Sequence, residues 1–99
     1  MKCYFLKLIP PRPTFPADIS PREAELMGQH AAYWRQLLDQ DRAIAAGPVL
    51  DPAGTYGVAL IRLADDQDPE ALVGQDPVIL GQAGFRWEIR PMLSLMVKG

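Results

Sequence analysis

The chain has 99 residues, of which 48% are hydrophobic and 22% are charged, and its formal net charge at pH 7 is −2. These values are typical of one globular domain, so we expect a single domain over residues 1–99. Because the Lys and Arg residues are scattered and form no basic stripe, we expect no nucleic-acid partner.

The single cysteine, Cys3, leaves no second thiol for an intrachain disulfide and favours a reducing compartment. The apolar run after Lys2 is interrupted by Lys7 and lacks a small-residue cleavage site, so it predicts a strand and not a signal peptide. No apolar run approaches the roughly 20 residues of a membrane-spanning helix. We therefore expect a cytoplasmic protein with no membrane partner.

The first predicted elements are a strand over residues 2–9 and a stiff loop over residues 10–19. The strand is rich in aliphatic and aromatic side chains, and Pro10 ends it too early for a helix. Four prolines exclude a helix from the loop. The loop is either a rigid connector or the rim of a cleft to which Arg12 contributes, and the sequence leaves both interpretations open.

Residues 20–42 predict a long amphipathic helix. Ser20 suits the N-cap, Pro21 suits the first helical position, and Glu23 has the spacing of a capping box. Two neighbouring stripes of mainly apolar residues form the face expected to be buried: Leu26, His30, Tyr33 and Leu37, and Met27, Ala31, Trp34 and Leu38. Arg35 falls on the opposite side, which can face water. The only histidine of the chain therefore lies where apolar residues are expected.

Two strands, over residues 43–50 and 56–63, are predicted to form a hairpin after this helix. Gly47 and Pro48 suit a strand that bends or lies at a sheet edge. The sequence Asp51-Pro52-Ala53-Gly54 between the strands favours a tight turn.

A second helix is predicted over residues 70–75. Pro77 disfavours a helical conformation at Asp76, so the helix breaks there, and Asp76 can cap a further helical turn over residues 78–82. Apolar and charged residues then alternate over residues 85–90, which predicts the last strand.

The predicted order of elements, βαββαβ, is that of a ferredoxin-like α+β fold. This fold has a four-stranded antiparallel sheet with two helices on one face. The strands over residues 2–9 and 56–63 carry apolar residues on both faces, so the face without helices would be left uncovered. We therefore expect a homodimer formed through that sheet face.

His30 and Asp76 are the candidate catalytic residues. The topology places the first helix and the break in the second helix on the same side of the sheet. A carboxylate bonded to one imidazole nitrogen fixes the tautomer and leaves the other nitrogen free to exchange a proton. The structural alternatives are a His30 bonded to a backbone carbonyl at the core edge and an Asp76 that only caps a helical turn.

Other kinds of site have little support in the sequence. One histidine without a cysteine pair is a poor set of metal ligands, so we expect no metal and no cofactor. No motif places a serine or cysteine beside His30, so a nucleophilic triad is not predicted.

Four features occur in a characteristic order: His30 in the first helix, Ala46-Gly47-Pro48 after it, Asp76-Pro77 inside the sequence GQDPV, and the closing segment FRWEIRP over residues 85–91. In these features the chain resembles the YCII-related (YciI-like) family of small ferredoxin-like proteins. The resemblance implies a dimeric α+β barrel with a His-Asp pair in an active-site cleft, carried here by His30 and Asp76. Some members have an Arg-Pro pair just before the histidine, where this chain has Met27 and Gly28. Lyase-type removal of HCl from a chlorinated aromatic is among the activities linked to the family.

We therefore expect a small enzyme of proton-transfer type, such as an isomerase, a lyase or a dehydrohalogenase-like enzyme, that acts on a small organic ligand without a cofactor. His30 is the expected general acid or base, and Asp76 is expected to orient it. The residues expected to line the pocket are Arg12, Tyr33, Trp34, Gly47 and Pro48. The alternative is a non-catalytic dimeric module for ligand binding or regulation.

Overall fold

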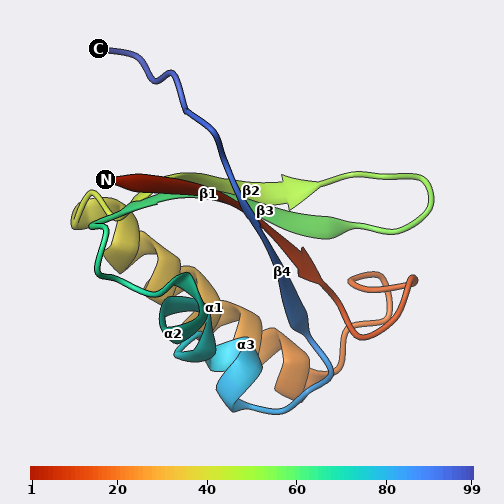
Figure 1. Cartoon of the computed structure of the whole chain (residues 1–99). Coiled ribbons are helices and arrows are strands. Elements are labelled where there is room, and N and C mark those ends of the chain that lie inside the picture. Colours follow the sequence, from red (N-terminus) through yellow and green to blue (C-terminus); the bar gives the residue numbers. More distant parts are fainter.

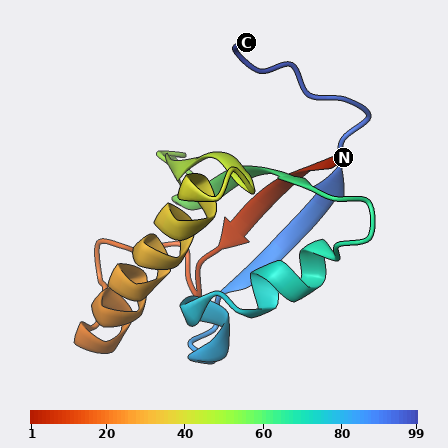
Figure 2. The ribbon, with the colours of Figure 1, turned by 90° about the vertical axis from the view of Figure 1, so that its left-hand side faces the viewer.

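Four strands form one antiparallel sheet with the order β2-β3-β1-β4, and the helices lie on one of its faces (Figure 1). The computed structural model describes residues 1–99. The elements are β1 (Lys2–Ile9), α1 (Pro21–Asp39), β2 (Ala43–Val49), β3 (Tyr56–Leu63), α2 (Pro69–Gly74), α3 (Pro77–Leu80) and β4 (Arg86–Pro91). The ferredoxin-like α+β prediction is confirmed, and the broken second helix is observed as the separate helices α2 and α3. Figure 2 shows α1 beside the shorter pair, with the sheet behind them.

Helix α1 begins where the capping signals predict. The Ser20 side chain accepts a hydrogen bond from the Glu23 amide at 3.1 Å, and the Glu23 carboxylate accepts one from the Ser20 amide at 2.9 Å. This reciprocal capping box satisfies two amides that the first helical turn would otherwise leave without partners.

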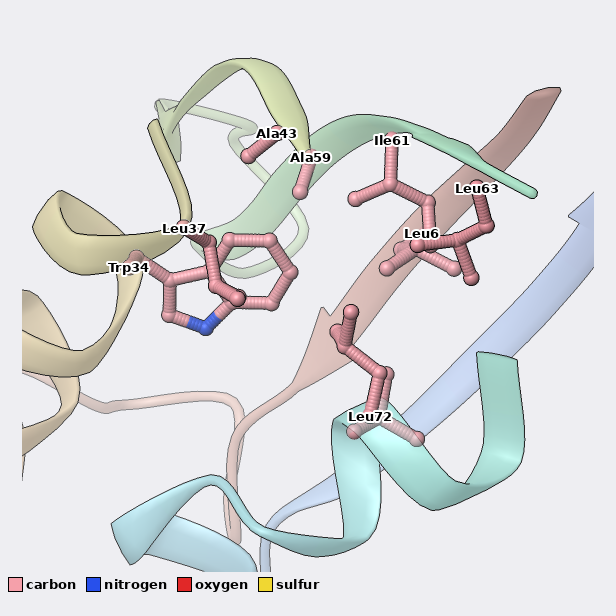
Figure 3. Close-up of a cluster of buried hydrophobic side chains, with 9 residues drawn as sticks. Leu6, Trp34, Leu37, Ala43, Ala59, Ile61, Leu63 and Leu72 are labelled. Atoms are coloured by element: carbon pink, nitrogen blue, oxygen red, sulfur yellow. The ribbon is translucent and has the colours of Figure 1, made fainter. Parts of the chain in front are cut away.

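The main hydrophobic core lies between the helices and the sheet (Figure 3). Its buried members come from α1, from the start of β2, from α2 and from the helix-facing positions of β1 and β3: Leu6, Trp34, Leu37, Ala43, Ala59, Ile61, Leu63, Leu72 and Val73. Full burial of one such Leu or Ile side chain contributes about 1.5–3 kcal/mol to folding. This core fixes α1 on the sheet and thereby sets where His30 lies.

A second, smaller core cluster closes the other end of the molecule. It contains Leu8, Phe15, Leu26, Val78 and Phe85, so it joins the loop over residues 10–19 to α1, α3 and the segment before β4. The rings of Phe15 and Phe85 meet edge to face at 5.3 Å between centroids. The proline-rich loop is therefore packed against the body of the protein.

The opposite face of the sheet is not covered by helices of this chain. Its central positions, Phe5, Val58 and Leu60, are half-buried. Charged side chains share this face, and the Lys7 ammonium lies 4.3 Å from the centroid of the Tyr56 ring. This face is therefore more polar than the apolar sequences of β1 and β3 predict.

Strand β4 ends at Pro91, and the tail that follows leaves the sheet without forming a strand (Figure 1). Leu93 and Met96 on this tail are fully exposed. None of the helices has the length and the apolar content needed to cross a membrane.

Candidate active site

Asp76 is the centre of the candidate site and has no exposed surface. It lies between α2 and α3, in an extended conformation with φ −62° and ψ 129°, because Pro77 disfavours the helical conformation in the residue before it. One carboxylate oxygen, Oδ1, accepts a hydrogen bond from the Val78 amide at 3.1 Å and so caps α3. The helix break thus turns a carboxylate into the interior.

Two indole groups also donate hydrogen bonds to this carboxylate. Trp34 Nε1, from α1, lies 2.8 Å from Asp76 Oδ2, and Trp87 Nε1, from β4, lies 3.3 Å from the same oxygen. A carboxylate removed from water is stable only where its oxygens are hydrogen-bonded. These donors come from three different elements, so the tertiary fold itself stabilises Asp76 in the interior.

His30 completes the set of donors around Asp76. Its Nδ1 lies 2.9 Å from Asp76 Oδ1 and 2.8 Å from Oδ2, and 17% of its side chain is exposed. Because an ionised carboxylate only accepts hydrogen bonds, this contact places a proton on Nδ1. The other ring nitrogen, Nε2, makes no hydrogen bond within the chain and is not fully buried. The nitrogen that remains accessible is therefore the one free to accept or release a proton.

His30 opens onto a cavity of about 470 Å³. The walls are formed by α1, by the loop over residues 10–19, by β2 and β3 and by the start of β4, and most of the lining is apolar. Trp34, Gly47 and Pro48 line this cavity together with His30, whereas Asp76 lies behind the imidazole and does not reach it. A volume of this size lies within the usual range for small-molecule sites.

A protein-family model for the YCII-related domain matches residues 4–93. The chain belongs to the YCII-related family. No curated protein shows significant similarity to it. The family assignment made from the sequence is confirmed, and the match covers every helix and strand of this YCII-related chain apart from the first residues of β1.

Arg12, which the sequence predicts in the pocket lining, does not line the cavity beside His30 in this YCII-related domain. Both terminal nitrogens of its guanidinium lie 2.7 Å from the two carboxylate oxygens of Glu23, and its Nε lies 2.8 Å from Asp18. These hydrogen bonds raise the pKa of Arg12 and lower the pKa of Glu23 to about 2. Arg12 therefore fastens the loop to the start of α1 and is not free to bind a ligand.

Tyr33 is also absent from the cavity wall. Its ring packs against the main core, and its hydroxyl donates a hydrogen bond to the carbonyl of Leu72 on α2. Burial, and to a lesser degree the negative charge of Asp76, raise the pKa of the Tyr33 phenol. Tyr33 lies one position before Trp34 on α1, and this turns it away from the cavity towards α2.

Several residues of the site were not singled out from the sequence. The alternation over residues 85–90 indicates only an apolar strand position for Trp87, although a buried indole N–H needs an acceptor and this signals a polar contact. Phe15 and Pro16 form part of the cavity wall, whereas the sequence indicates only that their proline-rich loop could rim a cleft. Arg35 lines the cavity although the helical pattern placed it on the water-facing side.

Proposed function

We propose that this YCII-related protein is a cofactor-independent enzyme of proton-transfer type that acts on a small, largely apolar organic molecule. The observation that supports the proposal is the contact between His30 Nδ1 and the fully buried Asp76, made while the same imidazole lines a cavity of about 470 Å³. Histidine is the side chain whose ordinary pKa lies nearest neutrality, so it exchanges protons readily there.

In this proposal, Nε2 of His30 removes a proton from a carbon or hydroxyl of the bound molecule. Asp76 holds the ring orientation and stabilises the imidazolium that forms, as a buried carboxylate does in other proton-transfer sites. In an isomerisation, the proton returns to a different atom of the same molecule. In an elimination, a leaving group departs with the bonding electron pair while His30 keeps the proton.

A direct test measures exchange of substrate hydrogens with solvent deuterium. A panel of small cyclic ketones, phenols and chlorinated rings is incubated with the protein in D2O, and mass spectrometry follows deuterium uptake or loss of chloride. We expect the wild type to act on at least one class and His30→Gln to lose about 100-fold or more of that rate. Equal rates in both proteins would contradict the assignment of His30.

The geometry around His30 offers a second test that needs no substrate. In ¹⁵N NMR spectra, the wild-type imidazole should show the tautomer protonated at Nδ1, because Asp76 accepts that hydrogen bond. Asp76→Asn should populate both tautomers. An imidazole protonated at Nε2 in the wild type would contradict the proposed proton carrier.

The alternative is a non-catalytic ligand-binding module, and one observation favours it. No serine, cysteine, aspartate or glutamate lines the cavity, so neither a nucleophile of these types nor a second carboxylate lies beside His30 there. This alternative predicts that His30→Ala still binds the same ligands in a thermal-shift screen and that no panel member exchanges hydrogens.

We also propose that the protein is a homodimer that covers the helix-free face of the sheet. Phe5, Val58 and Leu60 lie half-buried in the middle of this face, which is where a second copy would exclude water. Light scattering should give about 22 kDa, twice the 11.0 kDa of one chain. Leu60→Arg should give the monomer mass, while a wild-type monomer at micromolar concentration would contradict the proposal.

A further inference from the structure

The lining of the cavity beside His30 carries positive charge but no negative charge. Arg35 is the one permanently charged side chain in its lining, and neither aspartate nor glutamate is present there. The nearest negative charge that the site offers, Asp76, lies behind His30 and is already occupied by four N–H donors. The cavity therefore presents a cation without a counter-charge.

Arg35 differs from the arginines that have structural roles in this chain. Arg12 is bonded to two carboxylates and Arg86 to Glu88, whereas Arg35 makes no hydrogen bond or ion pair within the chain. It directly follows Trp34 and lies one helical turn after Ala31, and both of these residues also line the cavity. Helical side chains lean towards the helix N-terminus, so the guanidinium extends over the turn that carries His30.

We infer that the ligand of this cavity is a small apolar carboxylic acid whose carboxylate binds Arg35 at the cavity mouth. This inference rests on the proposed function and narrows its substrate class. A guanidinium binds a carboxylate through two parallel N–H···O bonds, while the apolar lining accepts the body of the molecule. The negative charge of Asp76 disfavours the carboxylate at the His30 end, so the ligand lies with its apolar carbon atoms at Nε2.

Cyclohexanecarboxylate and its neutral amide, cyclohexanecarboxamide, are a matched pair of probes. Both are titrated into the protein while NMR follows the backbone amides of Ala31 and Ala46, which line the cavity. We expect the carboxylate to bind the wild type about threefold to tenfold more tightly than the amide, because a charge-assisted contact is added. High salt should reduce this preference, because Arg35 is exposed.

Arg35→Gln should abolish the preference for the carboxylate and leave the affinity for the amide unchanged. Arg90→Gln is the control, because it removes the same charge from an exposed position on β4 that does not line the cavity. It should keep the wild-type preference.

The outcomes separate this inference from the proposed function. Equal affinity of the wild type for both probes, or a preference that survives in Arg35→Gln, would overturn the role of Arg35 while leaving His30 in a ligand-binding cavity. If neither probe shifted the amides of Ala31 and Ala46, the carboxylic-acid inference and the cavity on which the proposed function depends would both fail.

Discussion

Asp76 and Glu23 are the two buried acidic side chains of the protein, with 0% and 8% of their surface exposed. Each lies at the start of a helix, and each accepts hydrogen bonds from backbone and side-chain donors. Asp76 accepts from two indoles, an amide and the imidazole of His30, whereas Glu23 binds the permanently charged Arg12. The two carboxylates thus have similar positions and different partners.

The partner determines what each carboxylate can do. A guanidinium keeps its proton at every pH at which the protein is folded, so the contact between Glu23 and Arg12 can only hold the loop in place. An imidazole gains and loses a proton near neutrality, so the contact between Asp76 and His30 can take part in chemistry. Burial of a carboxylate does not by itself separate a structural from a functional role.

The largest expected effect is that of Asp76→Ala. This change leaves the donors of Trp34, Trp87 and Val78 without their acceptor in the interior, so we expect a loss of about 3 kcal/mol or more in the free energy of unfolding. Urea denaturation followed by circular dichroism measures it. Asp76→Asn keeps one acceptor oxygen and should lose about 1–2 kcal/mol. Wild-type stability in Asp76→Ala would show that the buried carboxylate contributes nothing to folding.

A smaller effect is expected for Arg12→Gln, which breaks the contact of the loop with Glu23 on α1 and the contact of Arg12 with Asp18 inside the loop. The loop carries Phe15 and Pro16 of the cavity wall, so hydrogen exchange over residues 14–19 should accelerate and cyclohexanecarboxamide should bind several-fold more weakly. In Arg12→Gln, His30 should keep the same tautomer as in the wild type.

Arg86→Gln is the control for this change, because it also breaks an arginine–glutamate contact, but an exposed one that does not tie the loop over residues 10–19 to α1. An unchanged exchange rate over residues 14–19 in Arg12→Gln would show that the ion pairs do not anchor the loop.

The smallest expected effect is on the pH dependence of stability. The pKa of Glu23 is lowered from its ordinary 4.5 to about 2, chiefly by its hydrogen bonds with Arg12. A carboxylate with a lowered folded-state pKa stabilises the protein above its ordinary pKa, and this contribution is lost as the pH falls from about 4.5 towards 2. The melting-temperature difference between the wild type and Glu23→Gln should therefore narrow over that range. A constant difference from pH 6 to pH 3 would contradict the lowered pKa.

Local sequence signals were sufficient for most of the fold. Ser20 and Glu23 marked the start of α1, and Pro77 marked the break at which Asp76 caps α3, because capping and proline sterics act over a few residues. The βαββαβ order then left few ways to pair the strands. This topology allowed His30 and Asp76 to meet, because both lie on the helical side of the sheet, and the resemblance to the family implied that they form a pair.

The remaining features depend on distances that a sequence pattern does not contain. The sequence predicts Arg12 at the cavity, but its guanidinium instead forms hydrogen bonds with the carboxylates of Asp18 and Glu23. Trp87 donates to Asp76 only because β4 pairs with β1 in one particular register. Arg35 lines the cavity because a long side chain can extend beyond the helical face that its position predicts.

The chain contains two tryptophans, and both donate their indole hydrogens to Asp76 and line the cavity. All indole fluorescence of the protein therefore originates at one place. The arrival of a ligand or a change in the charge of His30 should alter the emission spectrum without any added dye, so the site contains its own optical reporter.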